Sequence, residues 1–222
     1  MIEELLPPGV ASSEAFDDEA PAVLFPAEAA LMAGRRERRR RQFATARACA
    51  RRALAGIGRE PVALLPGPGG APGWPAGVVG SITHCEGYRA AVAAPAGTVA
   101  ALGIDAEPAG PLPEGVLGLV ASERERGRLA VLGARDGSVP WERLLFCAKE
   151  AVYKAWYPAT GLWLGFADAE VALSREGTFR AVLRPPVAAA AVVDPVYEGR
   201  WLVAGGLVLT AVVRHAPAGV AP

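Results

Sequence analysis

The sequence predicts an α+β protein made of two similar α/β halves with a ligand cleft between them. Apolar residues recur at helical spacing in two long segments, residues 27–57 and residues 141–157, and short apolar runs typical of strands follow each segment. With 222 residues, 52% of them hydrophobic, the chain is long enough to bury a sizeable core. We expect the division between the halves near Ile104, which gives residues 1–104 and residues 105–222, although no internal repeat is visible.

The charges of the chain balance, with 23 Lys and Arg residues against 23 Asp and Glu residues. A net charge of zero provides no general attraction for nucleic acid or an anionic membrane. No run of 18 apolar residues occurs, and the first residues include Glu3 and Glu4 instead of a basic and then apolar leader. The three cysteines lack Cys-x-x-Cys spacing, which favours reduced thiols over a zinc site. We expect a soluble, cytoplasmic monomer with no nucleic-acid or membrane partner.

The first half is expected to begin with a loop and continue as one interrupted helix. Residues 1–26 are acidic, rich in Pro and Ala and weakly periodic, which predicts mostly loop. Residues 27–57 predict a helix that is broken near Gly34 and ends at residues 56–58. A run of arginines on its polar face favours a solvated surface over a nucleic-acid site. Strands are expected in residues 62–65, 78–82, 88–94 and 99–104, the last three as antiparallel neighbours.

The second half is expected to contain two helices before most of its strands. Ser122 and Glu125 form a capping box that begins one helix, and the apolar residues before it, residues 116–120, predict core. The strongest periodic signal, residues 141–157, predicts a helix that ends at Pro158. A turn is expected in residues 162–166, strands near residues 169–173, 178–183, 188–193 and 201–213, and a disordered tail in residues 216–222.

Asp105 and Glu107 directly follow a predicted buried strand and should share one of its faces. Residues 99–104 have the length and apolar content of such a strand, and side chains two positions apart point the same way. The two Cα atoms would lie about 6.6 Å apart, a span that two carboxylates can close onto a hard divalent cation such as Mg²⁺. Pro108 would end the strand. The alternative is a solvated turn that happens to carry an acidic pair.

Glu150 and Lys154 lie one turn apart on the second long helix, opposite its apolar stripe. Phe146, Cys147 and Tyr153 flank them and are too apolar for an open surface. We therefore expect this second face to line a cleft. An ordinary Glu-to-Lys surface pair is the alternative, and it would explain the two charges but not the apolar flank.

Three motifs, in this order, resemble the signatures of the 4′-phosphopantetheinyl transferases, and most closely the Sfp-type enzymes related to enterobactin synthetase component D. They are residues 80–85 (Gly-Ser-Ile-Thr-His-Cys), residues 103–107 (Gly-Ile-Asp-Ala-Glu) and residues 146–154 (Phe-Cys-Ala-Lys-Glu-Ala-Val-Tyr-Lys). The resemblance extends from about Arg39 to about Arg214. It implies a pseudo-symmetric pair of α/β halves, coenzyme A as substrate and Mg²⁺ as cofactor, with Mn²⁺ as an alternative metal.

The resemblance also assigns residues to the coenzyme. Arg39 and Arg47 lie two helical turns apart and match positions that hold the 3′-phosphate of coenzyme A, a task suited to the planar fork of arginine. Thr83 and His84 match positions that contact the coenzyme phosphates. A lone histidine is more often structural, and the family match is what favours a functional role for His84.

The Pro- and Gly-rich stretch after residue 65 matches the loop that lines the adenine end of coenzyme A in the resembling enzymes. Gly67 and Gly69 are the backbone positions assigned to it. Many relatives carry Lys or Arg in this loop, whereas residues 66–74 contain no charge. Nucleotide affinity would then depend more heavily on Arg39 and Arg47.

The implied reaction is attack by a serine hydroxyl of an apo acyl or peptidyl carrier protein on the β-phosphate of coenzyme A, which releases 3′,5′-ADP. Such a transfer needs cations on the pyrophosphate and a base near the hydroxyl. Asp105, Glu107 and Glu150 would hold the metal, and Lys149 and Lys154 would complement the phosphate charge. Glu150 is the candidate base and Glu107 the runner-up.

Two other classes of function remain open from the sequence. A different Mg²⁺-dependent nucleotide enzyme would use the same charged residues without a carrier protein. A non-catalytic module that binds coenzyme A or a carrier protein would use the arginines and tolerate loss of the acids. In the resembling enzymes the region after the metal-binding strand helps to receive the carrier, so exposed side chains in residues 116–120 are an alternative to the core interpretation.

Overall fold

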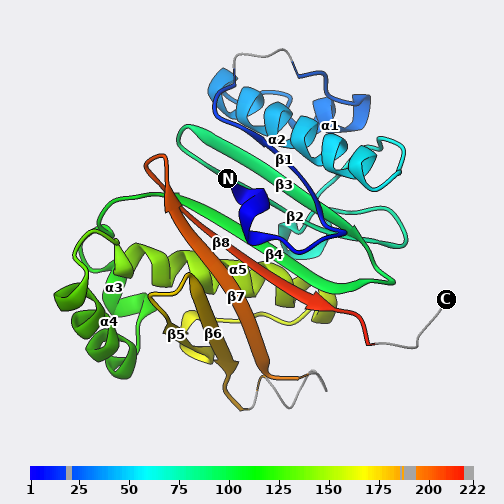
Figure 1. The fold of residues 1–222 in the computed structure, drawn as a ribbon. Helices are drawn as coiled ribbons and strands as arrows, with labels where there is room; N and C mark the ends of the chain where they lie inside the picture. Colours follow the sequence, from blue (N-terminus) through cyan, green and yellow to red (C-terminus); the bar gives the residue numbers. More distant parts are fainter. Residues whose placement is uncertain (19–21, 186, 188–193, 218–222) are drawn as a thin grey trace.

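The computed structural model describes residues 1–18, 22–185, 187 and 194–217. It contains two antiparallel sheets and two long helices, so the predicted α+β class is confirmed (Figure 1). One sheet has three strands in the order β1-β3-β2, and the other has five strands in the order β4-β8-β7-β6-β5.

The N-terminal residues contribute structure that the sequence did not predict. They form a short 3-10 helix, η1 (Ile2–Leu5), and a strand, β1 (Ala11–Ala15), which pairs with β3 (Tyr88–Pro95). The prediction of mostly loop holds for most of the other described residues of this segment but missed η1 and β1. β1 has little apolar periodicity of its own and forms through its ladder with β3. The strand β2 (Val78–Cys85) pairs with the other edge of β3, as expected.

The first helical segment is interrupted as predicted. It forms α1 (Pro26–Leu31) and α2 (Glu37–Gly56), with Gly34 at φ 72° between them. This left-handed conformation suits glycine and stops a helix. The buried face of α2 packs on the three-stranded sheet through Cys49, Ala50, Ala53 and Leu54.

The second sheet begins with β4 (Val99–Pro108), which pairs with β8 (Leu207–His215). The expected pairing of β4 with β3 is therefore wrong. Because β4 runs without a break through Ile104, a division at that residue would cut a strand in the middle. We propose instead that the two halves divide in the turn between β3 and β4.

The two predicted helices of the second half are present as α4 (Glu123–Arg135) and α5 (Trp141–Thr160), and the capping box of Ser122 and Glu125 is found at the start of α4. A short helix that was not predicted, α3 (Val116–Val120), precedes them. However, α5 continues past Pro158 and ends at Gly161, which has φ 68°. A proline in the last turn is tolerated when the chain is already leaving the helix, so Pro158 was the wrong end point.

The remaining strands are β5 (Ala169–Leu173), β6 (Thr178–Leu183) and β7 (Val196–Ala204), preceded by the 3-10 helix η3 (Phe166–Asp168). The strand expected over residues 201–213 is a hairpin of β7 and β8 that turns at Gly205 and Gly206. The strand expected over residues 62–65 is absent from the described structure. An isolated bridge between Pro66 and Pro72 follows these residues and flanks the short 3-10 helix η2 (Pro68–Gly70) on both sides. The predictions for residues 188–193 and 218–222 lie outside the described residues.

The two sheets meet along β2 and β4 through side-chain hydroxyls. Ser81 Oγ accepts a hydrogen bond from the Ile104 amide at 3.1 Å, and Thr83 Oγ1 accepts one from the Ala106 amide at 3.1 Å. These bonds satisfy buried donors on the edge of β4 that no neighbouring strand pairs. A core of side chains from β3, β4, β8 and η1 fills the angle between the sheets, while α5 packs on the opposite face of the five-stranded sheet.

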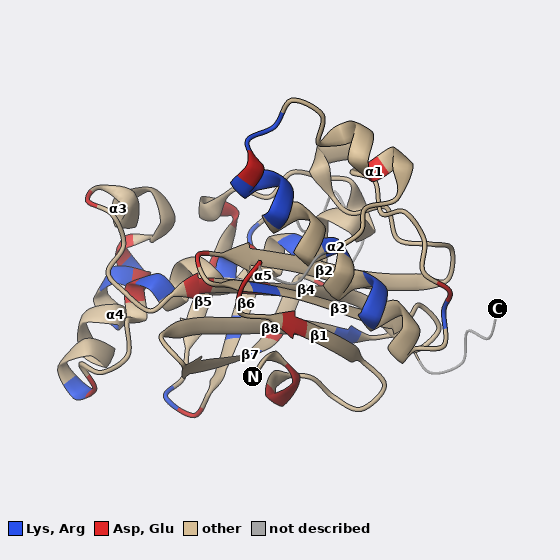
Figure 2. Cartoon of the chain, turned by 90° about the horizontal axis from the view of Figure 1, so that it is seen from above, with Lys and Arg blue, Asp and Glu red and all other residues tan. Residues whose placement is uncertain are grey.

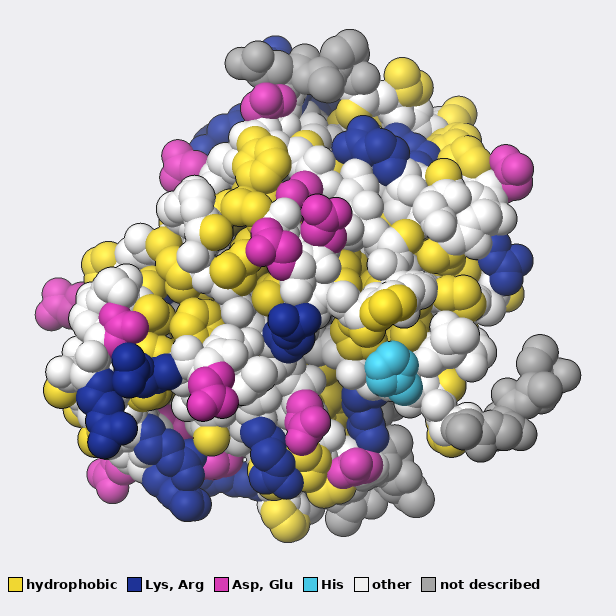
Figure 3. Space-filling model, viewed as in Figure 1, with side chains coloured by type: hydrophobic (Ala, Val, Ile, Leu, Met, Phe, Trp, Pro, Cys, Tyr) yellow, Lys and Arg dark blue, Asp and Glu magenta, His cyan; other side chains and the backbone are white. Residues whose placement is uncertain are grey.

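Charged residues are spread widely over the surface. Figure 2 shows the basic run before and within the first turns of α2, and the face in Figure 3 carries both signs of charge among hydrophobic side chains. The three cysteines are free thiols. None of the helices among the described residues is long and apolar enough to cross a membrane.

Candidate functional site

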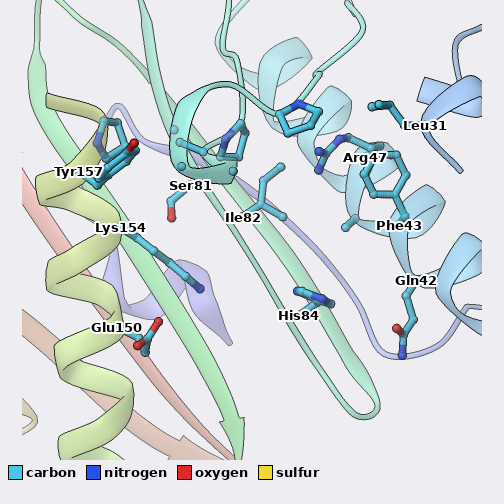
Figure 4. Close-up of a pocket in the computed structure, with 18 of the residues that line it drawn as sticks. Leu31, Gln42, Phe43, Arg47, Ser81, Ile82, His84, Glu150, Lys154 and Tyr157 are labelled. Carbon is cyan, nitrogen blue, oxygen red and sulfur yellow. The ribbon is translucent and has the colours of Figure 1, made fainter. Parts of the chain in front are cut away.

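A cavity of about 520 Å³ lies between the two halves of the chain. Its walls come from α1, α2, the loop after residue 65, β2 and the middle of α5 (Figure 4). The polar side chains that line it are Arg35, Arg39, Gln42, Arg47, Ser81, His84, Glu150, Tyr153, Lys154 and Tyr157. Six of the residues selected from the sequence therefore line one cavity: Arg39, Arg47, Gly69, His84, Glu150 and Lys154.

Arg39 and His84 are in direct contact at the wall of this cavity. Arg39 Nη1 lies 2.8 Å from His84 Nε2. Loss of solvation, reinforced by the positive charges of Arg39 and Lys154, lowers the pKa of His84 to about 4. The ring is then neutral at pH 7, and because an arginine can only donate, Nε2 must be the acceptor. This contact places the Arg39 guanidinium beside the C-terminal end of β2.

Arg47 is buried, yet its guanidinium lines the cavity. Its Nε donates to the Leu64 carbonyl at 2.8 Å, and its guanidinium carbon lies 4.2 Å from the centre of the Phe43 ring. In Figure 4 the nitrogen end of Arg47 points into the cavity beside Phe43. Burial lowers the pKa of Arg47, an effect partly offset by the charge of Glu28, but an arginine remains cationic at neutral pH.

The uncharged loop contributes backbone and prolines to the cavity, from Pro66 and from residues 69–72. Gly69 lines the cavity and has φ 62°, and a Cβ atom added there would lie 2.3 Å from the Tyr157 ring. Glycine at this position lets the loop of the first half touch α5 of the second. Gly67 does not line the cavity, since its amide donates to the Ala71 carbonyl at 2.7 Å. Its assignment to the ligand is thus not supported by its position.

Asp105 connects the two halves at the base of the cavity. Its Oδ1 accepts from Lys154 Nζ at 2.6 Å and from Thr83 Oγ1 at 3.1 Å. Burial alone would lower the pKa of Lys154, but the charge of Asp105 raises it, so the ammonium stays protonated. Thr83 is 1% exposed and held within this network, which means that its expected contact with a coenzyme phosphate would have to be indirect. The Lys154 ammonium approaches Asp105 instead of forming the surface pair with Glu150.

The three carboxylates chosen for the metal are close enough to influence one another. Burial, followed by the charge of Asp105, raises the pKa of both Glu107 and Glu150. Glu107 is held by Arg143, whose Nη1 lies 3.2 Å from Glu107 Oε2. Among the described residues, no three Asp, Glu, His or Cys side chains are grouped closely enough to hold a metal as they stand. The assignment of these three carboxylates to a metal therefore stays a prediction, and in this structure the cations of Lys154 and Arg143 engage two of the acids.

The same carboxylates nevertheless fit a hard cation in charge and in donor type. Asp105 Oδ2 is buried and has no hydrogen-bond partner among the described residues. An unpaired buried carboxylate oxygen is unfavourable, and a divalent cation would satisfy it. A cation would also offset the repulsion that raises the pKa values of Glu107 and Glu150.

Lys149 is separated from the cavity, contrary to the prediction that it complements the phosphates. Its Nζ donates to the Val120 carbonyl, to Glu125 Oε2 and to the Phe166 carbonyl, each at 2.8 Å. These three acceptors use all the donors of an ammonium group. Cys147 also differs from its expected place in the cleft, since it is buried against β8, with Sγ 3.3 Å from Thr210 Oγ1.

Sequence reasoning missed several residues of the site. Tyr157 lines the cavity one turn beyond Tyr153 and Lys154, and the helical spacing that selected Glu150 and Lys154 could also have found it. Glu28 supports Arg47 from behind, at 4.0 Å from Nε. No sequence signal separates Glu28 from the other acids near the N-terminus.

The comparison with known families agrees with this geometry. Residues 27–94 match the 4′-phosphopantetheinyl transferase N-terminal domain, and residues 101–207 match the 4′-phosphopantetheinyl transferase superfamily. The chain belongs to the 4′-phosphopantetheinyl transferase superfamily. The two matched regions contain the two walls of the cavity.

Three curated relatives cover nearly the whole chain. The 4′-phosphopantetheinyl transferase Svp of Streptomyces mobaraensis is 51% identical over 227 residues, covering 100% of this chain and 92% of the relative. The transferase Npt of Nocardia iowensis is 47% identical, covering 96% and 99%, and PptT of Mycobacterium tuberculosis is 42% identical, covering 92% and 92%. The protein is accordingly a transferase of phosphopantetheine.

Proposed function

We propose that the protein transfers the 4′-phosphopantetheine group from coenzyme A to a serine of an apo acyl or peptidyl carrier protein, with Mg²⁺ as cofactor, and releases 3′,5′-ADP. The observation that carries the proposal is the cavity between the halves, where the cations Arg39, Arg47 and Lys154 and the acid Glu150 face one space. A pyrophosphate ligand needs cations, and the transfer needs a carboxylate beside them.

The coenzyme is assigned to the cavity by its cations. Arg47 and Arg39 lie on α2, where they would bind the 3′-phosphate, and the uncharged loop with Gly69 would line the adenine end. Lys154, from the opposite wall, would face the pyrophosphate together with His84. We leave Lys149 and Gly67 out of this set because their polar groups are engaged within the protein.

Asp105, Glu107 and Glu150 would hold the metal, Mg²⁺ or, as an alternative, Mn²⁺. The bound ion would supply charge stabilisation to the phosphate oxygens. Lys154 would orient the phosphoanhydride and neutralise part of its charge. Release of Glu107 from Arg143 would accompany its use as a ligand.

Glu150 is the better candidate for the base that takes the proton of the serine hydroxyl. It lines the cavity, whereas Glu107 lies outside it and is paired with Arg143. Burial raises the pKa of Glu150, with a further contribution from the charge of Asp105, and a higher pKa makes a carboxylate a stronger base. The serine oxygen would form its bond to the β-phosphorus as the bond to the bridging oxygen of 3′,5′-ADP breaks.

The carrier protein would approach from the side of the site where the segment after α5 carries Trp163. A smaller cavity of about 150 Å³, lined by Glu150, Trp163 and Phe166 among others, adjoins the main one. Trp163 is 73% exposed and Leu119, on α3, is 77% exposed. Large exposed apolar side chains beside a site favour a protein partner, so the exposed alternative for part of residues 116–120 is retained.

The test is a mass measurement of the carrier. The protein is incubated with coenzyme A, Mg²⁺ and an apo carrier protein, and the carrier is expected to gain the mass of one phosphopantetheine group. A parallel reaction with a carrier whose acceptor serine is replaced by alanine should show no gain. Absence of any gain across fatty-acid, polyketide and peptide carriers would contradict the proposal.

The same experiment separates the two alternatives. A different Mg²⁺-dependent nucleotide enzyme would consume its nucleotide without a carrier, and a binding module would retain coenzyme A without modifying either partner. We also propose that the protein acts as a monomer in the cytoplasm. The carrier assay does not depend on either of these two points.

A further inference from the structure

The buried carboxylate of Glu28 lies directly behind the arginine wall of the cavity. Glu28 is 0% exposed, although an ionised carboxylate is costly to bury. It belongs to α1, whose residues Leu31 and Met32 line the cavity, but Glu28 itself does not. Its partners show what this costly group is used for.

The two oxygens of Glu28 hold three separate segments together. Oε2 accepts from Arg51 Nη1 at 3.0 Å and from the Phe25 amide at 3.0 Å. Oε1 accepts from the Leu64 amide at 2.9 Å. The carboxylate therefore joins the start of α1, the middle of α2 and the chain that leads into the uncharged loop.

Arg47 is positioned through the same peptide. The Leu64 amide donates to Glu28, and the Leu64 carbonyl accepts from Arg47 Nε at 2.8 Å. Among the described residues, this carbonyl is the one hydrogen-bond acceptor of the Arg47 guanidinium. With Nε bound at the back and the ring of Phe43 against its face, Arg47 keeps its two terminal nitrogens available on the cavity side.

Arg51 provides the contrast. Its Nη1 is bound to Glu28 and its Nη2 donates to the Val23 carbonyl at 2.6 Å, so this guanidinium is used inside the protein. Glu28 thus binds Arg51 directly, but it acts on Arg47 mainly through Leu64, with its own oxygen 4.0 Å from Nε. This division leaves one arginine structural and the other available to a ligand.

We propose that Glu28 is a positioning residue that fixes the Leu64 peptide and, through it, holds the Arg47 fork toward the anionic group it binds, the 3′-phosphate of coenzyme A. The inference rests on the proposed function. Sites that bind phosphate tightly hold their arginines in place before the ligand arrives, because less freedom is then lost on binding. Glu28 would raise selectivity for the phosphate without touching it.

The experiment compares the dissociation constants of coenzyme A and 3′-dephospho-coenzyme A by calorimetry, without a carrier protein. In Glu28→Gln the dissociation constant of 3′-dephospho-coenzyme A divided by that of coenzyme A is expected to fall about tenfold, the scale of one lost charge-assisted hydrogen bond. Arg47→Ala should lower this ratio to the same value. The double variant should lower it no further, because both changes remove the same interaction.

Arg51→Gln is the matched control. It removes the direct ion-pair partner of Glu28 and should lower the midpoint of thermal unfolding, but it leaves Leu64 and Arg47 in place, so the ratio should stay at the wild-type value. If Glu28→Gln does not fold, Glu28→Asp is used in its place. Aspartate keeps the negative charge but is shorter by one methylene group, so this variant should lower the ratio less than Glu28→Gln.

An unchanged ratio in the folded Glu28 variant would overturn the inference, and so would an equal fall in Arg51→Gln, which would mean that any loosening of α1 suffices. A wild-type protein that binds both ligands equally would also overturn it, while leaving transfer to a carrier as a separate result. Conversely, a wild-type protein that selects coenzyme A but modifies no carrier would contradict the proposed function alone.

Discussion

At the scale of single residues, the site depends on acids whose environment opposes their ionisation. Glu150 and Glu107 both have pKa values raised by burial and by the charge of Asp105. Such a group binds protons more tightly in the folded than in the unfolded chain, so its ionisation destabilises the fold as pH rises. Functional sites often retain such unfavourable groups because the chemistry requires them.

Glu150→Gln is expected to stabilise the protein at neutral pH while it strongly slows transfer. With Glu150 present, the folded protein loses stability as the pH rises from the pKa of the unfolded chain, near 4.5, through the raised pKa of the folded chain. With glutamine at this position, that loss does not occur. Thermal melts at several pH values should therefore show a gain for the variant at neutral pH that disappears in acid. Transfer should fall by about 10²- to 10⁴-fold, the typical contribution of a general base.

The control for this prediction is Glu142→Gln, which changes an exposed acid on the same helix. It should show neither the gain in stability nor the loss of transfer. Full activity in Glu150→Gln would move the base elsewhere, and a gain in stability that persists in acid would show that charge is not its cause.

Lys149 shows how a residue beside the site can be structural. It is 4% exposed and Glu125 is 1% exposed, so they form a buried ion pair that ties α5 to α3, α4 and the segment before β5. Burial lowers the pKa of Lys149, opposed by Glu125. Removing one partner of such a pair leaves the other charge without compensation.

Lys149→Met should lower the free energy of unfolding by about 3–5 kcal/mol. Replacing both partners, as in Lys149→Met with Glu125→Gln, should recover part of that loss because no unpaired charge remains. Denaturant titrations measure both values. Calorimetry on the folded Lys149→Met protein should give a dissociation constant for coenzyme A close to that of the wild type; a large increase would restore the phosphate role predicted from the sequence.

At the scale of elements, the cavity depends on close approaches between neighbouring segments. Gly103, on β4, lies against α5 so closely that an added Cβ would be 2.0 Å from the Ala151 carbonyl oxygen. Gly69 makes the corresponding approach from the loop to Tyr157. Both glycines therefore set distances between segments that carry different parts of the site.

Gly69→Ala should weaken coenzyme A binding more than Gly70→Ala. Both positions have positive φ, 62° and 80°, so both variants carry the backbone cost of about 1–2 kcal/mol for a left-handed residue. Only the Cβ at position 69 would collide with Tyr157, whereas nothing lies within 4 Å of the one at position 70. Thermal melts and calorimetry on the two variants provide the comparison, and equal effects would rule out the contact with Tyr157 as the cause.

At the scale of the whole molecule, the two sheets are joined by hydroxyl groups where the site is formed. Ser81 and Thr83 each accept a hydrogen bond from a buried amide of β4, but only Thr83 also donates to Asp105. The contact that joins the halves therefore also supports Asp105, one of the acids proposed to bind the metal.

Thr83→Val and Ser81→Ala should each lower the free energy of unfolding by about 1–3 kcal/mol, because each leaves a buried amide without its acceptor. Only Thr83→Val should reduce transfer strongly, since Asp105 then loses a donor that orients it. Parallel denaturation and carrier-mass assays measure the two effects. A matching loss of transfer in both variants would mean that the joint itself, and not the orientation of Asp105, controls activity.

The sequence alone determined the features that local pattern encodes. The two long helices, the break near Gly34, the capping box at Ser122 and most strands follow from periodicity and turn chemistry. The motifs that hold Asp105, His84, Glu150 and Lys154 identified the family, and the structure places the last three of these around one cavity, with Asp105 bound to Lys154 at its base.

Tertiary structure decided the features that depend on distant partners. The pairing of β1 with β3 and of β4 with β8 joins segments far apart in the chain, for which the residues themselves carry little local signal. The direction of a charged side chain is decided by which acceptors the fold brings near it. For this reason Lys149 and Lys154, five residues apart on one helix, differ in their contacts. Lys149 donates to Glu125 in the core, and Lys154 donates to Asp105 at the base of the cavity.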